Sequence, residues 1–420
     1  MGSVTESAVV EPPTLHLTAQ PEEQISLLAS SNKACWRTAT TETLRQMLDF
    51  AQYSPQAREQ CLALHSRLVC PNMGPAPDLE ATAKGCLTSD STPIEYSFSF
   101  GGSEDRPVVR YSIDPDGTSG LGAFSASSVR AIADSLRAMR GVDMSWYDII
   151  RDSMRLETAN EPAFGALVRQ AGHTSQVMFG FDFEHGDGVN AKAYFLPCLT
   201  AAERQITRWK VVREAVEKIA NVTGVSMATI MPQLNMLQEH LRSYGHFMEE
   251  NVRYLATDLI QPEEARLKIY IRCPSAEFEQ VWSFMTMHGK VPYSEEHRSA
   301  IKMLYEATVE NRGCSSITTD AFQKQSICYF VLKQGAEVPS SKLFIRMGSK
   351  GAGSDVEIAR TVREWRPPTG DPDIIYEESL RSAFSRHDLD ADVAAHAWLA
   401  VSVKKGRLTL ESYLVPKLEA

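Results

Sequence analysis

The sequence predicts an α+β protein in which about ten antiparallel strands close into a barrel around a solvent-filled lumen, with helices packed outside. Two observations favour this fold. Strand-like runs come in pairs separated by helical runs, and this order repeats along the 420 residues. Several strands also alternate between apolar and polar residues, so each has two unlike faces. A closed barrel suits both features, because helices cover the apolar outer face and closure removes unpaired strand edges.

Composition and charge narrow the function classes. Hydrophobic residues make up 43% of the chain and charged residues 23%, which is typical of a soluble globular protein. The net charge of −10 disfavours a nucleic-acid partner. The first residues lack the pattern of a signal peptide, no apolar run of about 18 residues predicts a membrane span, and eight scattered cysteines favour reduced thiols. We therefore expect a cytoplasmic protein without a membrane partner; a homodimer is compatible with the sequence.

The chain is expected to begin with a flexible tail over residues 1–24, followed by one barrel domain over residues 25–420. Residues 41–69 are rich in helix formers and predict two helices, the second starting at Pro55, since proline is favoured in a first helical turn. Apolar residues at three- and four-residue spacing predict further helices. Their ranges are 125–141, 200–220 and 275–289.

Four pairs of strands and one single strand can be recognised from alternation and from their aromatic and β-branched residues. The pairs are 94–100 with 108–114, 176–183 with 192–197, 328–332 with 342–347, and 397–403 with 408–416. The single strand, residues 266–272, reads RLKIYIR and lacks an obvious partner. Its alternation is strict, with aliphatic residues on one face and cationic or phenolic residues on the other.

The apolar set of each strand is assigned to the outer face, which leaves the polar set facing the lumen. In residues 94–100 the outward set is Ile94, Tyr96, Phe98 and Phe100, and the inward set is Glu95, Ser97 and Ser99. In residues 108–114, Arg110 faces inward. The other strands add inward cations and aromatic rings: Lys192, Tyr194, Arg266, Lys268, Tyr270, Lys342 and Phe344.

Five cations in one confined lumen need a shared anion, because an unpaired buried charge costs several kcal/mol. These cations are Arg110, Lys192, Arg266, Lys268 and Lys342, and the one carboxylate expected with them is Glu95. A diphosphate meets that need, since its oxygens accept hydrogen bonds from arginine and lysine. The interleaved aromatic rings suit a carbocation that forms when the diphosphate leaves, because ring faces stabilise cations and exclude water.

Five motifs occur in order along the chain: PIEYSFSF, the arginine of VVRYSIDP, KAYF, RLKIYIR and KLFI. Together they resemble the fungal dimethylallyl tryptophan synthase family of aromatic prenyltransferases, over about residues 36–416. The resemblance implies an α-β-β-α (ABBA) barrel in which the five cations hold the diphosphate of dimethylallyl diphosphate. It implies an aromatic shield and substrate-binding set of Tyr194, Tyr270, Tyr329, Phe344, Trp398 and Tyr413. Ile94 and Glu95 would bind the acceptor, with Glu95 taking its proton.

The activity implied by the resemblance is transfer of a dimethylallyl group to an electron-rich aromatic ring by electrophilic substitution. No metal is expected to be required, because the cations replace it and the chain has no paired DDxxD motif; Mg²⁺ or Ca²⁺ would only enhance the rate. His173 is a second catalytic candidate, as a relay for the proton lost from the ring carbon.

Indole acceptors derived from tryptophan are the commonest in the family that the chain resembles. Phe344, Trp398 and Thr409 stand where relatives often have tyrosine, so a phenolic or polycyclic polyketide acceptor stays open. Two rival functions are also left open: a non-catalytic barrel that binds an anionic hydrophobic ligand, and a nucleic-acid surface, which the net charge disfavours.

Overall fold

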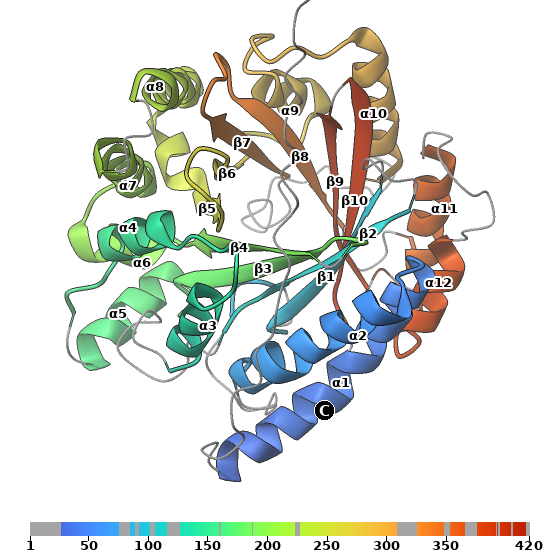
Figure 1. The fold of residues 1–420 in the computed structure, drawn as a ribbon. Coiled ribbons are helices and arrows are strands. Elements are labelled where there is room, and N and C mark those ends of the chain that lie inside the picture. The colour runs from blue at the N-terminus through green and yellow to red at the C-terminus, as the bar shows by residue number, and fades with distance from the viewer. Residues whose placement is uncertain are drawn as a thin grey trace, which may run out of the picture.

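A computed structural model of the chain shows ten antiparallel strands that close into a barrel (Figure 1). The strand order around the barrel is β1-β10-β9-β8-β7-β6-β5-β4-β3-β2, so every strand pairs with its neighbours in sequence and β1 pairs with β10 to close the barrel. The structure describes residues 27–74, 85–88, 92–100, 106–115, 127–158, 161–186, 188–222, 227–308, 326–347, 353–365, 376–391, 393, 395–404 and 406–416. The predicted tail over residues 1–24 lies outside these ranges.

The strands of the barrel confirm the predicted antiparallel pairs and add one strand. They are β1 Ile94–Phe100, β2 Val108–Ile113, β3 Val177–Phe183, β4 Val189–Phe195, β5 Val252–Asp258, β6 Arg266–Arg272, β7 Ile327–Lys333, β8 Ser340–Arg346, β9 His396–Lys404 and β10 Arg407–Leu414. The added strand is β5, which pairs with β6 and supplies the missing partner of RLKIYIR. β5 is not apparent from the sequence, because its register shifts between Val252 and Tyr254 and this shift breaks the alternation of faces.

Helices surround the strands and lie on their outer side (Figure 1). The α-helices are α1 Leu27–Phe50, α2 Pro55–Leu64, α3 Ser127–Arg137, α4 Ser145–Ser153, α5 Glu161–Ala171, α6 Cys198–Arg204, α7 Arg208–Val222, α8 Met227–Ser243, α9 Phe278–Met285, α10 Glu295–Thr308, α11 Asp355–Trp365 and α12 Tyr376–Ala383. Short segments of other helical types are η1 His65–Val69, η2 Cys70–Asn72 and η4 His246–Asn251. Among the described residues, we find no helix with the length and apolar character that a membrane crossing requires.

Local chemistry explains where several helices begin and end. The start of α2 at Pro55 is as predicted, and the Ser54 side chain caps it by accepting a hydrogen bond from the Ala57 N–H at 3.2 Å. The helix predicted over residues 200–220 is instead two helices, α6 and α7. Gln205 adopts a left-handed conformation with φ of 52°, which ends α6.

The outer faces of the strands form the main apolar core together with the helices. On β1, Ile94, Tyr96 and Phe98 are fully buried in this core, so the outward assignment of this strand is confirmed. The Tyr96 hydroxyl donates to the Thr40 carbonyl of α1 at 2.8 Å and ties the strand to the helix. This packing holds the polar faces of the strands toward the lumen, because successive side chains of a strand point to opposite faces.

Candidate active site

The inward side chains form three zones along the barrel. On β6 these zones are represented in turn by Lys268, Tyr270 and Arg272, and on β8 by Lys342, Phe344 and Arg346. At about 3.3 Å per residue, the first and last zones are about 13 Å apart along each strand. The first zone gathers cations and carboxylates, the second gathers aromatic rings, and the third gathers arginines.

We call the first zone the mixed-charge cluster; it consists of Arg110, Lys192, Arg266, Lys268, Lys342, Lys404, Asp182, Asp258 and Glu411. Glu411 of β10 accepts from Lys342 Nζ at 2.6 Å and from Arg110 Nη1 at 2.7 Å, and Lys404 Nζ lies 3.8 Å from it. This one carboxylate therefore joins side chains from three strands other than its own.

The other two carboxylates of the cluster each join two cations. Asp258 lies 2.5 Å from Lys268 Nζ and 2.6 Å from Arg266 Nε. Asp182 accepts a hydrogen bond from Lys192, and Arg110 Nε lies 3.3 Å from it. The five cations predicted from the sequence are thus brought together.

The predicted charge balance of the lumen needs correction. Glu95 was expected to be the one carboxylate among the cations, whereas Asp182, Asp258 and Glu411 fill that role, and Lys404 adds a sixth cation. When all six cations are protonated, they leave three positive charges in excess of the three carboxylates, which suits a bound diphosphate. Asp182 could have been found, since the alternate residues Phe179, Phe181 and Phe183 mark the outer face of its strand.

Burial and neighbouring charges determine the protonation of this cluster. Burial alone would raise the pKa of Asp258, but Lys268 and Arg266 outweigh it and hold that pKa well below its usual range. For Lys268 and Lys342 burial dominates and lowers the pKa of each to about 7, against the opposing effect of their carboxylate partners. An anion bound beside these ammonium groups would raise both pKa values again.

The second zone, which we call the aromatic belt, consists of Tyr194, Tyr254, Tyr270, Tyr329, Phe344, Trp398 and Tyr413. Tyr270 lies at its centre, with ring centroids 4.9 Å from Tyr329, 5.6 Å from Tyr254 and 5.6 Å from Phe344. All six aromatic residues predicted for the shield lie in this cluster, and Tyr254 of the missed strand β5 joins them. Lys342 Nζ lies 5.7 Å from the Tyr329 ring centre, so the belt adjoins the mixed-charge cluster.

Gly180 of β3 shapes the belt by having no side chain. It faces the lumen opposite Lys192 and Ser112, and a Cβ atom there would lie 2.9 Å from Cε2 of the Tyr194 ring. The ring of Tyr194 therefore packs directly over the backbone of β3. No sequence pattern predicts this contact, because it depends on the register between β3 and β4.

Glu95 lies on the inner face of β1, at the end remote from the mixed-charge cluster. It is four residues from Ser99, which pairs with Glu411 of the cluster. Its side chain is buried, and Oε1 has no hydrogen-bond partner in the described part of the chain. Burial raises the pKa of Glu95 to about 8, although Arg346 acts against this rise. An unpartnered buried carboxyl in a lumen is suited to receive a hydrogen bond from a ligand.

Two predicted site residues do not join this arrangement. Ile94 is a correction: its side chain lies in the outer core opposite Ile113, with the barrel wall between it and the lumen. His173 is buried and lies 3.1 Å, measured from Nε2, from the Cys198 sulfur at the start of α6. Burial, with help from Arg253 and Arg208, lowers the pKa of His173 to about 4, so it is neutral at pH 7. Its relay role stays a prediction.

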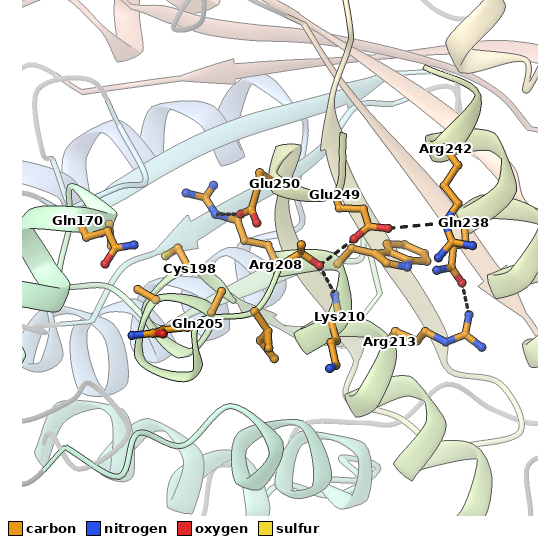
Figure 2. A pocket seen from close by; sticks show the side chains of 16 residues that line it. Gln170, Cys198, Gln205, Arg208, Lys210, Arg213, Gln238, Arg242, Glu249 and Glu250 are labelled. Atoms are coloured by element: carbon orange, nitrogen blue, oxygen red, sulfur yellow. Dashed lines mark hydrogen bonds and ion pairs between the residues drawn. The ribbon is translucent and has the colours of Figure 1, made fainter. Parts of the chain in front are cut away.

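A pocket of about 880 Å³ lies outside the barrel wall, among α5, α6, α7, α8 and η4 (Figure 2). Its lining is mostly polar and internally paired: Arg208 lies 3.8 Å from Glu250, and Arg213 donates to Gln238 at 2.6 Å. None of the mixed-charge cluster or the aromatic belt lines it. Within the described ranges, no group of three or more histidine, cysteine, aspartate or glutamate residues is arranged to hold a metal ion.

Comparisons with known proteins agree with this geometry. "Prenyltransferase phnF" of Penicillium herquei is 27% identical, with 94% of each chain covered. "4-O-dimethylallyl-L-tyrosine synthase" of Claviceps purpurea is 23% identical, covering 91% of this chain and 87% of that protein. Among solved structures, NotF in complex with brevianamide F and DMSPP has a TM-score of 0.75 at 18% identity, covering 93% of this chain and 96% of that one. That likeness confirms the ABBA barrel fold.

The family itself is identified by a sequence model that matches most of the chain. This family model, named tryptophan dimethylallyltransferase, matches residues 32–373, a range that includes Glu95 and the predicted cations. The chain belongs to the tryptophan dimethylallyltransferase family and is a prenyltransferase.

Proposed function

We propose that this protein transfers the dimethylallyl group of dimethylallyl diphosphate to an electron-rich aromatic acceptor, with a tryptophan-derived indole as the first class of acceptor. The main support is the arrangement of the lumen. Three excess positive charges lie beside an aromatic belt, and the unpartnered carboxyl of Glu95 lies at the other end. These zones match a leaving diphosphate, a carbocation and the proton of the acceptor.

The first step breaks the bond between the allylic carbon and the diphosphate oxygen. The electron pair leaves with the diphosphate, whose added negative charge Lys268, Lys342 and their neighbours stabilise. The dimethylallyl cation then lies against the aromatic belt, where ring faces attract it and displace water. The distance of 5.7 Å between Lys342 and Tyr329 shows how closely these two environments adjoin.

The second step forms a bond between a ring carbon of the acceptor and an allylic carbon. Glu95 accepts a hydrogen bond from the N–H of the acceptor, which increases the electron density of the ring as the bond forms. Glu95 takes up the N–H proton, directly or through water, as this bond forms. The substituted ring carbon then loses its own proton to water, which restores aromaticity, and Glu95 returns its proton to the nitrogen, so one proton is released in all.

A phenolic acceptor is the second candidate. Its support is a relative whose name describes 4-O-dimethylallyl-L-tyrosine, together with Phe344 and Trp398 in the belt. With a phenol, Glu95 would accept the O–H proton and the attacking atom would be the phenol oxygen or a ring carbon. The belt would contact either kind of ring, because aromatic side chains recognise ring faces.

We also propose that the reaction needs no metal, because the three excess charges of the mixed-charge cluster already match a diphosphate. The test incubates the protein with dimethylallyl diphosphate, EDTA and a panel of indoles and phenols, and detects products by mass spectrometry. Prenylated product in EDTA is expected. Product only with added Mg²⁺ would contradict metal independence, and no product under any condition would favour a binding barrel.

A further inference from the structure

A glycine in the wall of the lumen determines where the ring of Tyr194 lies. Gly180 is on the inner face of β3, where it pairs with Ser112 of β2 and with Lys192 of β4. A Cβ atom added to it would lie 2.9 Å from Cε2 and 3.2 Å from the hydroxyl oxygen of Tyr194, and 3.5 Å from Oγ of Ser112. The first distance is shorter than real Cβ contacts, so any other residue at position 180 would displace the Tyr194 ring.

Backbone geometry does not explain why position 180 is a glycine. Gly180 does not have the positive φ that favours glycine, and its pairing with β2 and β4 is regular. Glycine in the interior of a strand lowers stability, because it has no side chain to pack. The space beside Gly180 is occupied by the Tyr194 ring, so the glycine serves the placement of that ring.

Tyr194 lies between the acceptor carboxyl and the centre of the aromatic belt. Its hydroxyl forms a hydrogen bond with Ser112, and Ser112 pairs across the sheet with Glu95 of β1. On the belt side, the Tyr194 ring makes an edge contact with Tyr270, with 6.0 Å between the ring centroids. An acceptor that binds to Glu95 and meets the allylic cation at the belt must therefore lie against the ring of Tyr194.

We propose that Gly180 determines acceptor specificity: by letting Tyr194 lie against the barrel wall, it leaves room beside Glu95 for an acceptor with two or more fused aromatic rings. This inference rests on the proposed function and specifies its acceptor class, which includes indoles and polycyclic phenols. The residue acts through Tyr194 and touches no reacting atom itself.

The direction of the effect follows from the position of the wall. Because the backbone of β3 lies behind the Tyr194 ring, a side chain at position 180 would displace this ring into the lumen. A packed site does not absorb added volume without cost, so the displaced ring would compete with the second ring of a fused acceptor. A single-ring acceptor is smaller and would be affected less.

The test compares acceptors that differ by one fused ring. One pair is 2-naphthol and phenol, and the other is indole and pyrrole. Each compound is titrated into the full-length protein saturated with the thiolodiphosphate analogue of the donor, and calorimetry measures the dissociation constants. A larger ring binds more tightly even without shape selection, because it buries more apolar area. The informative quantity is therefore the change in each affinity ratio between the wild-type protein and a variant.

Gly180→Ala is expected to reduce the preference for the fused ring by about 10-fold or more. The matched control is Gly165→Ala on α5, where the new Cβ would make an ordinary contact of 3.5 Å with the Arg169 side chain, so the wild-type ratios should be kept. A reduction in either pair of acceptors supports the inference. Unchanged ratios in both pairs, or equal loss of affinity for the two members of each pair, would overturn it.

Two further variants keep the test decisive if Gly180→Ala does not fold. Ser112→Ala releases the Tyr194 hydroxyl from the wall and is expected to reduce the ratio about 3-fold, as loss of one hydrogen bond predicts. In a Tyr194→Leu background the added Cβ meets no ring, so Gly180→Ala should change the ratio by less than about 2-fold. Wild-type ratios in Ser112→Ala, or a full effect of Gly180→Ala in the Tyr194→Leu background, would show that Gly180 does not act through Tyr194.

Failure of this inference and failure of the proposed function can be told apart. If prenylated products form and Gly180→Ala leaves the preference for fused rings unchanged, the transferase function stands and the role of Gly180 does not. If no acceptor is prenylated, the proposed function fails, whereas the binding ratios still report whether position 180 sets the width of the lumen.

Discussion

Lys342 and Glu411 meet on the inner face of the barrel from two strands that are not neighbours: Lys342 Nζ on β8 lies 2.6 Å from Glu411 Oε1 on β10, with β9 between them. Both side chains are almost completely buried. Glu411 also accepts from Arg110 at 2.7 Å. One carboxylate therefore offsets the repulsion among cations that converge from different strands before any ligand is bound.

The change Glu411→Gln tests this role. It keeps the size of the side chain and removes its charge, so Arg110, Lys342 and Lys404 repel one another with only Asp182, beside Arg110, to offset them. We expect the free energy of unfolding to fall by about 3 kcal/mol. Urea unfolding measures this change, and added inorganic diphosphate should recover part of it in the variant.

The matched control is Glu217→Gln, which removes one of the partners of Arg213, in a partly exposed pair on α7, and is expected to cost under about 0.5 kcal/mol. Equal stability of Glu411→Gln and the wild-type protein would show that Glu411 does not balance the cluster.

Lys268→Ala is expected to weaken binding of the donor. The variant removes an ammonium group from the mixed-charge cluster and leaves Asp258 paired with Arg266 at 2.6 Å, so the fold should be retained. Loss of a charged hydrogen bond predicts a dissociation constant for the thiolodiphosphate donor analogue about 10- to 100-fold larger. Calorimetry measures it, with the surface variant Lys302→Ala as control. Unchanged affinity would remove Lys268 from the donor site.

Glu95→Gln is expected to separate turnover from donor binding. The amide cannot accept the proton of the acceptor, so transfer should slow by about 10²- to 10⁴-fold. Donor affinity should not change, because Glu95 lies on the acceptor side of the aromatic belt. Product formation and donor titration are measured on the same preparation. Wild-type turnover in this variant would exclude Glu95 as the acceptor's base.

The raised pKa of Glu95 predicts a dependence of turnover on pH. Only the ionised carboxylate can take the acceptor proton, so kcat/KM should rise with pH up to about 8 and then level off. Between pH 4.5 and about 8 the carboxyl of Glu95 is protonated in the native state and ionised in the unfolded state. Its contribution to the free energy of unfolding therefore falls as pH rises through that window. A kcat/KM profile in which the rise ends near pH 5 would contradict the assignment.

Donor binding is expected to be coupled to protonation of the lysines of the mixed-charge cluster. Lys268 and Lys342 have pKa values of about 7 and are mostly neutral at pH 8 without ligand. The negative donor favours their charged forms, so binding at pH 8 should take up protons and binding at pH 6 should take up fewer. Calorimetry in buffers of different ionisation enthalpy measures the uptake; its absence at pH 8 would contradict these pKa values.

Much of the barrel could be predicted, because alternation of apolar and polar residues reports which face of a strand is covered. β6 is the strongest case, since its alternation is unbroken from Arg266 to Arg272. β5 was missed because its register shift interrupts the pattern. For the same reason Tyr254 and Asp258 of β5 were missed, although both lie in the lumen beside predicted residues.

The identities of the lumen cations could be predicted, but their partners could not. Arg110 meets Glu411 only because the barrel closes by pairing β1 with β10, which brings β2 and β10 to either side of β1. Such contacts depend on register and on the tilt of the strands, which a pattern within one strand does not contain. Ile94 shows the limit of transferring a role from family resemblance, since its own alternation already placed it on the outer face.

The most direct test of the account follows the fate of dimethylallyl diphosphate in the wild-type protein. The donor is incubated in EDTA with each acceptor of the panel, and mass spectrometry and NMR quantify the alkylated acceptor and the free prenyl alcohol. We predict that an acceptor gains one C₅H₈ unit at a ring position or heteroatom and that this product exceeds the alcohol, because the belt excludes water. Recovery of unchanged donor, or of prenyl alcohol alone, with every acceptor would contradict prenyl transfer in this lumen.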